Sequence, residues 1–344
     1  MECELYKSNL FKTSIMPLKT IDLQIYIYSG TQGSYSGSDL KYTITKEKLT
    51  NDTNIVFEVS ELVRDYIDLT FNNDYISRTL WVTTIATYKD ENNVVFTYGS
   101  PATNHYLALE GFGYFEDEIN PQLSTNALIT TSNIYLPDDT AGKIPIFAEG
   151  VGKYVIGSTT TQVTDDGNTN QKIQYIAVPA NTTDDVVVYA TNDSTVVKTI
   201  VVNNVCEPKF TPYKITFVNK YGAYQDLWVF KKTTEKFAVN DETYKANTVS
   251  NSSLSYNVYE GQQRRYNANA KTSLTVNTGY VKEDFTSAIE ELFLSENTWI
   301  RINNQTLPII MKTKSMTMKT VLNDRLIDYT LDFDFAFDKI NNVR

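Results

Sequence analysis

Two aspartates near the end of the chain, Asp332 and Asp334, are spaced as a pair of catalytic carboxylates could be. On a β-strand, residues two apart share one face and their backbones lie roughly 6.6 Å apart. This spacing falls between the carboxylate separations of retaining and inverting glycosidases. No neighbouring sequence feature marks either residue as a desolvated proton donor. We therefore predict no catalytic residue, while geometry alone leaves a polysaccharide-degrading enzyme open.

The other reactive side chains are few. His105 is the only histidine of the chain, which removes most routes to a Ser-His, Cys-His or multi-histidine metal centre. Cys206 has no histidine near it in sequence, so a catalytic thiolate would lack its usual base. We expect a structural histidine and a thiol without a catalytic role.

Metal and phosphate sites are also weakly indicated. The turn Asp165-Asp166-Gly167-Asn168 could contribute oxygen ligands to calcium, but the twelve-residue loop with its closing glutamate is missing. The glycines of 30–33 and 111–113 are not followed by the residues and helix that hold a phosphate, so flexible loops are expected there. We predict no metal site and no cofactor.

The most regular pattern of the chain runs from Ile327 to Asp338, where apolar and polar residues alternate. A period of two predicts a strand with its bulky side chains in a core and its polar side chains on the other face. That second face carries a stripe of four aspartates: Asp328, Asp332, Asp334 and Asp338. The stripe must meet water, a cation or a repelled polyanion. In a ring of identical chains it would form an acidic band, so we predict these residues to lie at an interface or to line a lumen along which DNA slides.

Composition limits the partners. The chain has 344 residues, a net charge of −10 and a pI of about 4.8, and its densest basic stretches are the isolated pairs Lys231-Lys232 and Arg264-Arg265. A negative field of this kind disfavours binding to nucleic acid, so no sequence-specific nucleic-acid binding is predicted. We see no secretion signal near the start and no run of about eighteen apolar residues, and we predict no membrane insertion. Two cysteines fit synthesis in a reducing compartment.

Tyr, Phe, Thr, Asn and Ser are abundant, which predicts a mainly β fold. Prolines near 121 and 208 divide the chain into segments 1–121, 122–207 and 208–344. The central segment reads as a small immunoglobulin-like β-sandwich. Its expected strands are 144–147, 172–178, 186–190 and 195–202.

The outer segments follow a common order of strand, helix and further strands. The first contains a helix with Ser60 as its expected N-cap, then a strand with Trp81. The last contains a helix from about Glu283 to Leu294, then a strand with Trp299. We predict two related modules, each a β-sandwich with one helix, on either side of the central sandwich.

Two stretches of the last segment resemble virion structural proteins of tailed phages. They are FVNKYGAYQDLW, from Phe217 to Trp228, and the block from Ala288 to Phe337 that begins AIEELFLSENTWI and ends LIDYTLDFDFAF. Strands with an alternating acidic and aromatic segment, plus one packed helix, are similar to modules of tail-tube, distal-tail and baseplate-hub proteins. The resemblance implies ring assembly without cofactor or catalysis, and a central segment that docks or decorates. The sequence lacks the obvious long hairpin with which many tube subunits contact their neighbours, and the stretches 30–39 or 245–269 would have to serve instead.

Within the first stretch, Asn219 to Gly222 is expected to form a turn, because glycine adopts positive φ readily. A strand should follow. The aromatic residues here, Tyr221, Trp228 and Phe230, are expected to pack in a core or a subunit interface.

The leading hypothesis is a non-enzymatic component of a phage tail, neck or baseplate. Such a protein would be made in the host cytoplasm and reside in the virion, where its partners would be its own copies and other virion proteins. The alternative is a carbohydrate-binding or adhesion module of a phage fibre or a bacterial surface, with exposed Tyr and Trp as platforms for sugars.

Overall fold

The computed structural model describes residues 18–49, 55–96, 102–117, 127–207, 209–250, 252–317 and 327–340. Strands make up 48% of the structure and helices 10%, in several antiparallel sheets, which confirms a mainly β fold. The chain divides into two compact units. Unit 1 comprises the described residues that fall within 1–204, 217–226 and 284–295. Unit 2 comprises those within 205–216, 227–283 and 296–344. The three-segment division and the relationship between the outer modules stay predictions.

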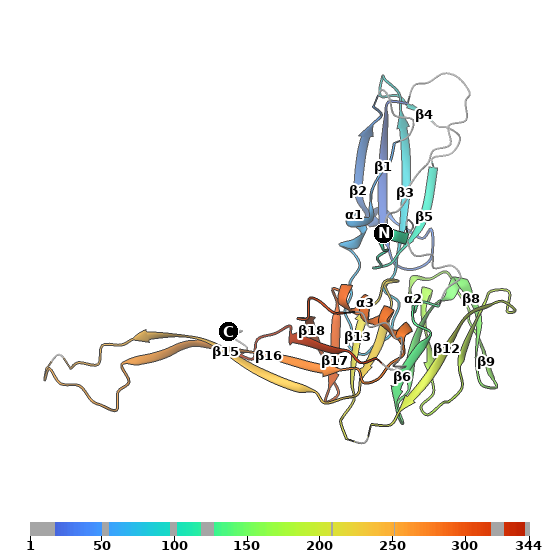
Figure 1. Cartoon of the computed structure of the whole chain (residues 1–344). Coiled ribbons are helices and arrows are strands. Elements are labelled where there is room, and N and C mark those ends of the chain that lie inside the picture. The colour runs from blue at the N-terminus through green and yellow to red at the C-terminus, as the bar shows by residue number, and fades with distance from the viewer. Residues whose placement is uncertain are drawn as a thin grey trace. The chain divides into compact units, whose positions relative to one another are not determined.

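Unit 1 begins with an antiparallel sheet of five strands. Its order is β2-β1-β3-β4, with β5 also paired to β3 (Figure 1). The strands are β1 (Thr20–Tyr28), β2 (Leu40–Glu47), β3 (Leu80–Lys89), β4 (Val95–Phe96) and β5 (Ala102–Ala108). Every second residue of β1 from Ile21 to Ile27 is buried, so one face of the sheet forms a core.

Helix α1 (Ser60–Arg64) covers part of this core with the buried Val63. The predicted N-cap is wrong by one residue, because Val59 occupies that position. The carboxylate of Glu58 explains the difference: it accepts hydrogen bonds from the backbone N–H and the hydroxyl of Ser60, which therefore does not cap the helix.

The central part of unit 1 has a five-stranded sheet of order β6-β12-β11-β8-β9 and a two-stranded sheet of β10 and β7. The strands are β6 (Asn133–Pro137), β7 (Gly142–Phe147), β8 (Val151–Ile156), β9 (Thr159–Gln162), β10 (Ile173–Val178), β11 (Val186–Ala190) and β12 (Val196–Val205). The four strands expected from sequence are confirmed as β7, β10, β11 and β12. The short helix α2 (Thr169–Lys172) precedes β10, and α3 (Thr286–Leu294) follows the 3-10 turn η4 (Glu283–Phe285), as predicted for that segment. Three further 3-10 turns of this unit are η1 (Gly37–Asp39), η2 (Phe115–Asp117) and η3 (Ala148–Gly150).

Unit 2 is built on a seven-stranded sheet of order β14-β13-β17-β18-β19-β16-β15, whose first two strands extend into the residues of unit 1. Its strands are β13 (Tyr213–Val218), β14 (Tyr224–Val229), β15 (Thr234–Lys245), β16 (Gln263–Asn277), β17 (Thr298–Ile302), β18 (Gln305–Met311) and β19 (Thr330–Phe335). The predicted turn at 323–325 lies outside the described residues.

The alternating segment holds its predicted pattern through β19 and then loses it. Tyr329, Leu331 and Phe333 are at most 2% exposed, whereas Phe337 is 44% exposed. The register of β19 with β18 ends where Phe335 faces Ile309, so Phe337 lies beyond the strand. The strand is therefore shorter than the twelve residues of the pattern.

The two longest strands of the sheet continue past their neighbours (Figure 1). β19 pairs only with Ser273–Asn277 of β16, while β15 pairs with β16 from Gln263 to Thr275. We call the arm the set formed by β15, residues 263–269 of β16 and the described connecting residues 246–250 and 252–262. Every residue of β15 is exposed. Sequence analysis offered 245–269 as one of two stretches for contact with a neighbour, beside 30–39, but did not predict the two strands.

The core of the alternating segment can be tested with two matched substitutions. We expect Phe333→Ala to lower the free energy of unfolding by about 3–5 kcal/mol, because it removes a fully buried ring. Phe337→Ala should cost less than about 1 kcal/mol, because its ring is half exposed. Urea denaturation measures both values, and equal losses would contradict the described end of the strand.

Candidate functional site

The aspartates of the acidic stripe form a cross-strand ladder with β16. Ser273 lies opposite Asp334 in the register, and its hydroxyl donates to the Asp334 carboxylate at 2.6 Å. The Thr275 hydroxyl donates to Asp332, which it faces. One step further, the Asn277 amide donates to Asp328 at 3.0 Å. Three of the four predicted interface residues thus accept hydrogen bonds from one neighbouring strand, while Asp338 lies exposed beyond β19.

A cation adds to this ladder. Lys312 Nζ lies 3.0 Å from Asp334 Oδ1. The Ser273 hydroxyl and then the Lys312 ammonium hold the pKa of Asp334 below its ordinary value. A carboxyl group with a lowered pKa stays ionised, which is the opposite of what a glycosidase proton donor requires.

The same sheet face continues into an apolar patch. Ile310 lies opposite Asp334 and shares its face, and Pro308, two residues earlier on β18, lies opposite Trp299 of β17. Ile310 is 59% exposed, Pro308 is exposed and Trp299 is half-buried. We call these three residues, together with Lys312, the outer patch.

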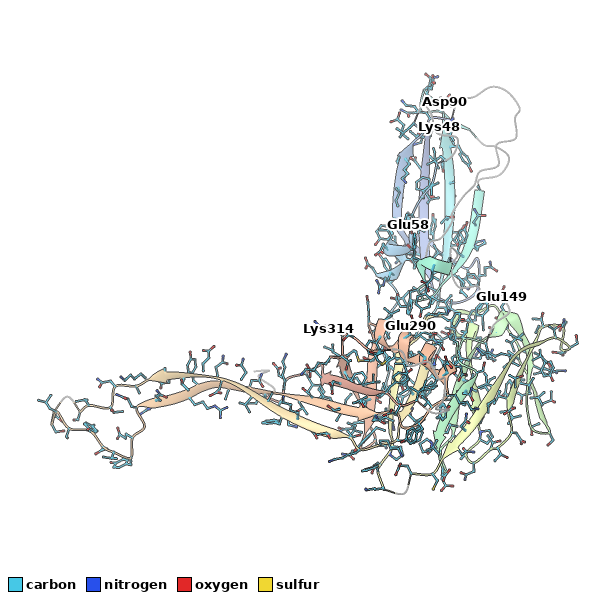
Figure 2. The ribbon with its side chains drawn as sticks, in the orientation of Figure 1. Lys48, Glu58, Asp90, Glu149, Glu290 and Lys314 are labelled. Atoms are coloured by element: carbon cyan, nitrogen blue, oxygen red, sulfur yellow. The ribbon has the colours of Figure 1, made fainter. Side chains whose placement is uncertain are left out.

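The arm exposes more apolar surface. Phe237, Val239, Tyr244 and Tyr266 are 47–58% exposed along its two strands. Four residues at its end are exposed further: Leu254 84%, Tyr256 68%, Val258 93% and Tyr259 85%. We call these four residues the tip. Figure 2 shows the side chains of β15 and β16 projecting from a ribbon over which the described residues form no second layer. The outer patch was not predicted as a site, whereas the tip lies within 245–269, one of the two stretches suggested for contact with a neighbour.

The three aromatic residues chosen from sequence lie in different environments. Phe230 is 2% exposed, and Trp228 is half-buried on β14. Tyr221 is half-buried against a small core that includes Leu128 and Phe147. The structure therefore does not bring them together as one exposed patch.

The predicted turn from Asn219 to Gly222 is confirmed. The buried Asn219 side chain accepts from the N–H groups of Tyr221 and Ala223, both at 3.1 Å, and donates to the Leu128 carbonyl at 2.7 Å. Gly222 has φ +74°, and a Cβ there would lie 2.6 Å from the Glu110 carbonyl oxygen. Gly111 is equally constrained, because its Cβ would lie 2.7 Å from the Lys220 carbonyl oxygen. Gly111 thus allows close backbone approach, a role that the expectation of a flexible loop missed.

A buried cation holds the Asp165 turn in place. Lys172 Nζ lies 2.7 Å from Asp165 and 2.9 Å from Glu149, which Figure 2 labels, and 5.3 Å from the centre of the Trp81 ring. Burial lowers the Lys172 pKa, but the two carboxylates outweigh it and the pKa is raised. Asp165 Oδ1 also accepts from the Gly167 N–H at 3.0 Å. These bonds engage the carboxylate that was considered for calcium.

A second buried charged group lies in α3. The Glu291 carboxylate, 1% exposed, accepts from the Thr130 hydroxyl and from the Lys220 N–H at 3.3 Å. Lys198 Nζ donates to the carbonyls of Ile129 and Thr130, both at 2.6 Å. Burial raises the pKa of Glu291 and lowers that of Lys198. These bonds join α3 to the segment before β6 and to the turn at Lys220, and burial keeps solvent from the carboxylate.

The remaining reactive residues show no assembled centre. His105 Nδ1 lies 2.7 Å from the Thr83 hydroxyl oxygen, and Cys206 is exposed and in no disulfide. Among the described residues, no group of three or more His, Cys, Asp and Glu side chains is placed to hold a metal. Within the same part of the chain, no helix is both long and apolar enough to cross a bilayer.

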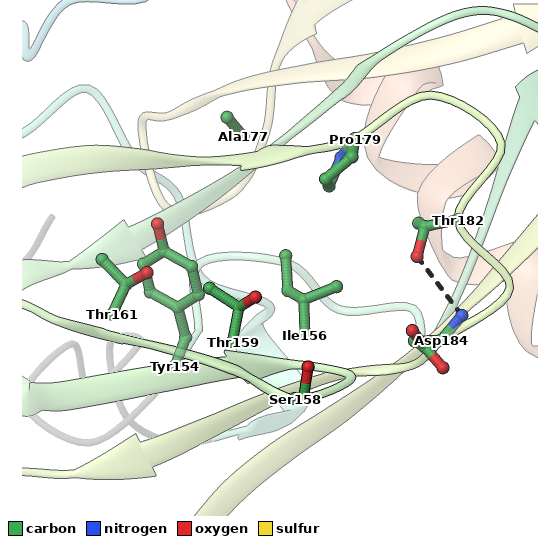
Figure 3. Close-up of a pocket in the computed structure, with 9 residues that line it drawn as sticks. All are labelled: Tyr154, Ile156, Ser158, Thr159, Thr161, Ala177, Pro179, Thr182 and Asp184. Carbon is green, nitrogen blue, oxygen red and sulfur yellow. Dashed lines mark hydrogen bonds between the residues drawn. The ribbon is translucent and has the colours of Figure 1, made fainter.

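One pocket lies in the central part of unit 1 (Figure 3). It has a volume of about 300 Å³ and is lined by Tyr154, Ile156, Ser158, Thr159, Thr161, Ala177, Pro179, Thr182 and Asp184. The Asp184 N–H donates to the Thr182 hydroxyl oxygen at 3.3 Å. Hydroxyl groups, one carboxylate and one phenol ring form a lining suited to a small polar ligand.

Comparison of the chain with protein-family models, curated proteins and solved structures found no match.

The buried Glu291 carboxylate has a predictable pH signature. A carboxyl group whose pKa is raised in the folded state contributes stability below its ordinary value of 4.5 and loses it as the pH rises through the folded pKa. Glu291→Gln should therefore gain stability relative to the natural chain as the pH rises from 4.5 toward neutrality. Thermal unfolding across this range measures the difference. Glu290→Gln, an exposed neighbour labelled in Figure 2, is the control and should show no such trend. A pH-independent difference for Glu291→Gln would contradict the burial argument.

Proposed function

We propose that this protein is a non-enzymatic structural subunit that works by self-association into rings and by docking to other proteins of a tailed-phage particle. The observation that carries the proposal is the arm of β15 and β16, which projects beyond its sheet. The phage context rests on the sequence resemblance of Phe217 to Trp228 and of the block from Ala288 to Phe337.

The arm supports an assembly role because exposing its apolar side chains to water is energetically unfavourable. A two-stranded ribbon has no opposite layer against which to bury its side chains and is marginally stable in water. This one nevertheless exposes eight large apolar side chains along its strands and at its tip. Exposed apolar clusters of this kind mark surfaces that a partner covers.

The acidic ladder also fits a structural role better than catalysis. Asp332 and Asp334 accept hydroxyl hydrogen bonds from β16, and Lys312 pairs with Asp334. These bonds fix both side chains on one face of the sheet. In a ring, this face would supply a repeated acidic band, and its orientation toward a lumen is part of the proposal.

The first test shortens the arm. Val239 and Ala270 face each other in the register, so an Asn-Gly turn can join them and replace residues 240–269. We expect the natural chain to form rings visible by electron microscopy, and the shortened chain to remain monomeric by light scattering. The thermal unfolding of the shortened chain should be cooperative, which controls for folding. A natural chain that stays monomeric at every concentration would contradict the proposal.

The pocket of Figure 3 favours a second candidate, a carbohydrate-binding module. Its Tyr154 ring could stack on a sugar, with Asp184 and the surrounding hydroxyls as hydrogen-bond partners. Trp81, by contrast, is 4% exposed and donates its indole N–H to the Gly167 carbonyl at 3.3 Å, so it offers no sugar platform.

This candidate predicts glycan retention by the isolated protein on an array. Asp184→Asn and Thr161→Ala should each weaken it about tenfold, because each removes a hydrogen bond to the sugar. A matched change away from the pocket, Asn192→Asp, should leave it unchanged. Absence of retention from every glycan tested would contradict the carbohydrate role.

A further inference from the structure

We propose that the tip of the arm binds the outer patch of a second copy of this chain, so that identical chains associate head to tail. The inference rests on the proposed function and specifies its contact: Leu254, Tyr256, Val258 and Tyr259 of one copy against Trp299, Pro308 and Ile310 of the next.

The tip has the chemistry of a protein-binding loop. Residues 252–262 are rich in Ser and Tyr, with Asn and Gly, and contain a single charged residue, Glu260. Tyr supplies large amphipathic contact area at a low cost in conformational entropy, and Ser and Asn supply adaptable hydrogen bonds. The backbone of Glu260 is fixed by a turn, since its N–H donates to the Asn257 carbonyl at 3.0 Å.

The outer patch offers a matching surface. Its three apolar side chains occupy neighbouring positions of β17 and β18, where the strands pair in register. Lys312 follows Ile310 by two residues and is 53% exposed. The ring of Trp299 and the aliphatic side chain of Ile310 can bury the aromatic and aliphatic groups of the tip. The ammonium of Lys312 can pair with the carboxylate of Glu260, the only charged residue within 252–262.

The length of the arm excludes binding within one chain. Ser273 lies in the same row of the sheet as Ile310, through Asp334. From Ser273 to Gln263 the ribbon runs ten residues outward, or roughly 33 Å at 3.3 Å per residue. The tip begins only beyond that point, and the paired strands hold it away from their own sheet (Figure 1). The outer patch that it can reach belongs to another copy.

Two different surfaces meet in this contact, so the association is heterologous. Repeating a heterologous contact produces a closed ring when the rotation closes and a filament when it does not. The contact therefore provides the head-to-tail geometry that a ring of identical subunits requires. It also places Asp334 and the acidic ladder beside every junction.

The experiment is site-directed cross-linking of the full chain. In a Cys3→Ser, Cys206→Ser background, Val258→Cys and Ile310→Cys are made separately, mixed, and treated with a short bismaleimide. We expect dimers in the mixture and a ladder of higher species when one chain carries both cysteines. Either single variant alone should stay uncross-linked, as should Val258→Cys mixed with Val196→Cys, an exposed position in the other unit. Equal cross-linking by Val258→Cys alone would indicate contact between two tips and overturn the inference.

Surface substitutions give a second measurement that does not depend on cross-linking. Tyr259→Ser and Ile310→Asp lie on exposed positions and should leave the thermal unfolding of the monomer unchanged. Each should weaken association by at least about thirtyfold, the effect of removing a buried interface anchor. Glu260→Lys should weaken association, and Lys312→Glu in the same chain should restore part of the loss.

The outcomes separate the two proposals. If the natural chain associates and these variants associate equally well, the tip-to-patch contact is overturned while the structural function stands. If the natural chain never associates with itself, both the self-assembly function and this contact are overturned.

Discussion

A two-stranded β-ribbon has no second layer, and this constraint decides what the arm of this protein can be. Among the described residues nothing is layered over its apolar side chains, which contact solvent unless a partner covers them. Natural proteins avoid leaving such surface bare, because it promotes unspecific pairing and aggregation. The register shift beside Asp241, where β16 contributes two residues against one of β15, and the charged residues along β15 disfavour simple edge-to-edge pairing. The arm is thus suited to a specific contact at its end.

The base of the arm is built to remain fixed while the tip makes that contact. β16 joins the arm to β19 and the rest of the sheet, and Leu274 and Val276 anchor it in the core. On the opposite face the same strand donates hydrogen bonds to Asp332 and Asp334 of β19. Core packing and the polar ladder therefore stabilise the same few residues of β16, which connect the arm to the rest of the sheet.

Sequence reasoning succeeded where one local signal determines the structure. The alternation from Ile327 predicted β19, the apolar spacing before Leu294 predicted α3, and Gly222 marked a turn that only glycine fits. It failed where contacts that the pattern does not encode determine the structure. Phe337 continues the pattern in sequence but lies beyond the end of β19, and Ser60 lost its capping role to Glu58.

The two strands of the arm were missed for a similar reason. β15 reads as a mixed polar segment without strict alternation, because neither of its faces is buried. Its tip and the outer patch are separated by many residues, and only the register of β17, β18 and β19 places Ile310 beside Asp334. The acidic stripe was visible in sequence, but the donors Ser273 and Thr275 became visible only with the pairing of β16.

Hydrogen exchange of the arm amides, measured on the isolated monomer and on the assembled protein, tests the central claim most directly. The account predicts fast exchange of residues 252–262 and of the arm strands in the monomer, and strong protection of the same amides after assembly. Equal exchange of the arm in both states, with protection appearing elsewhere, would contradict it.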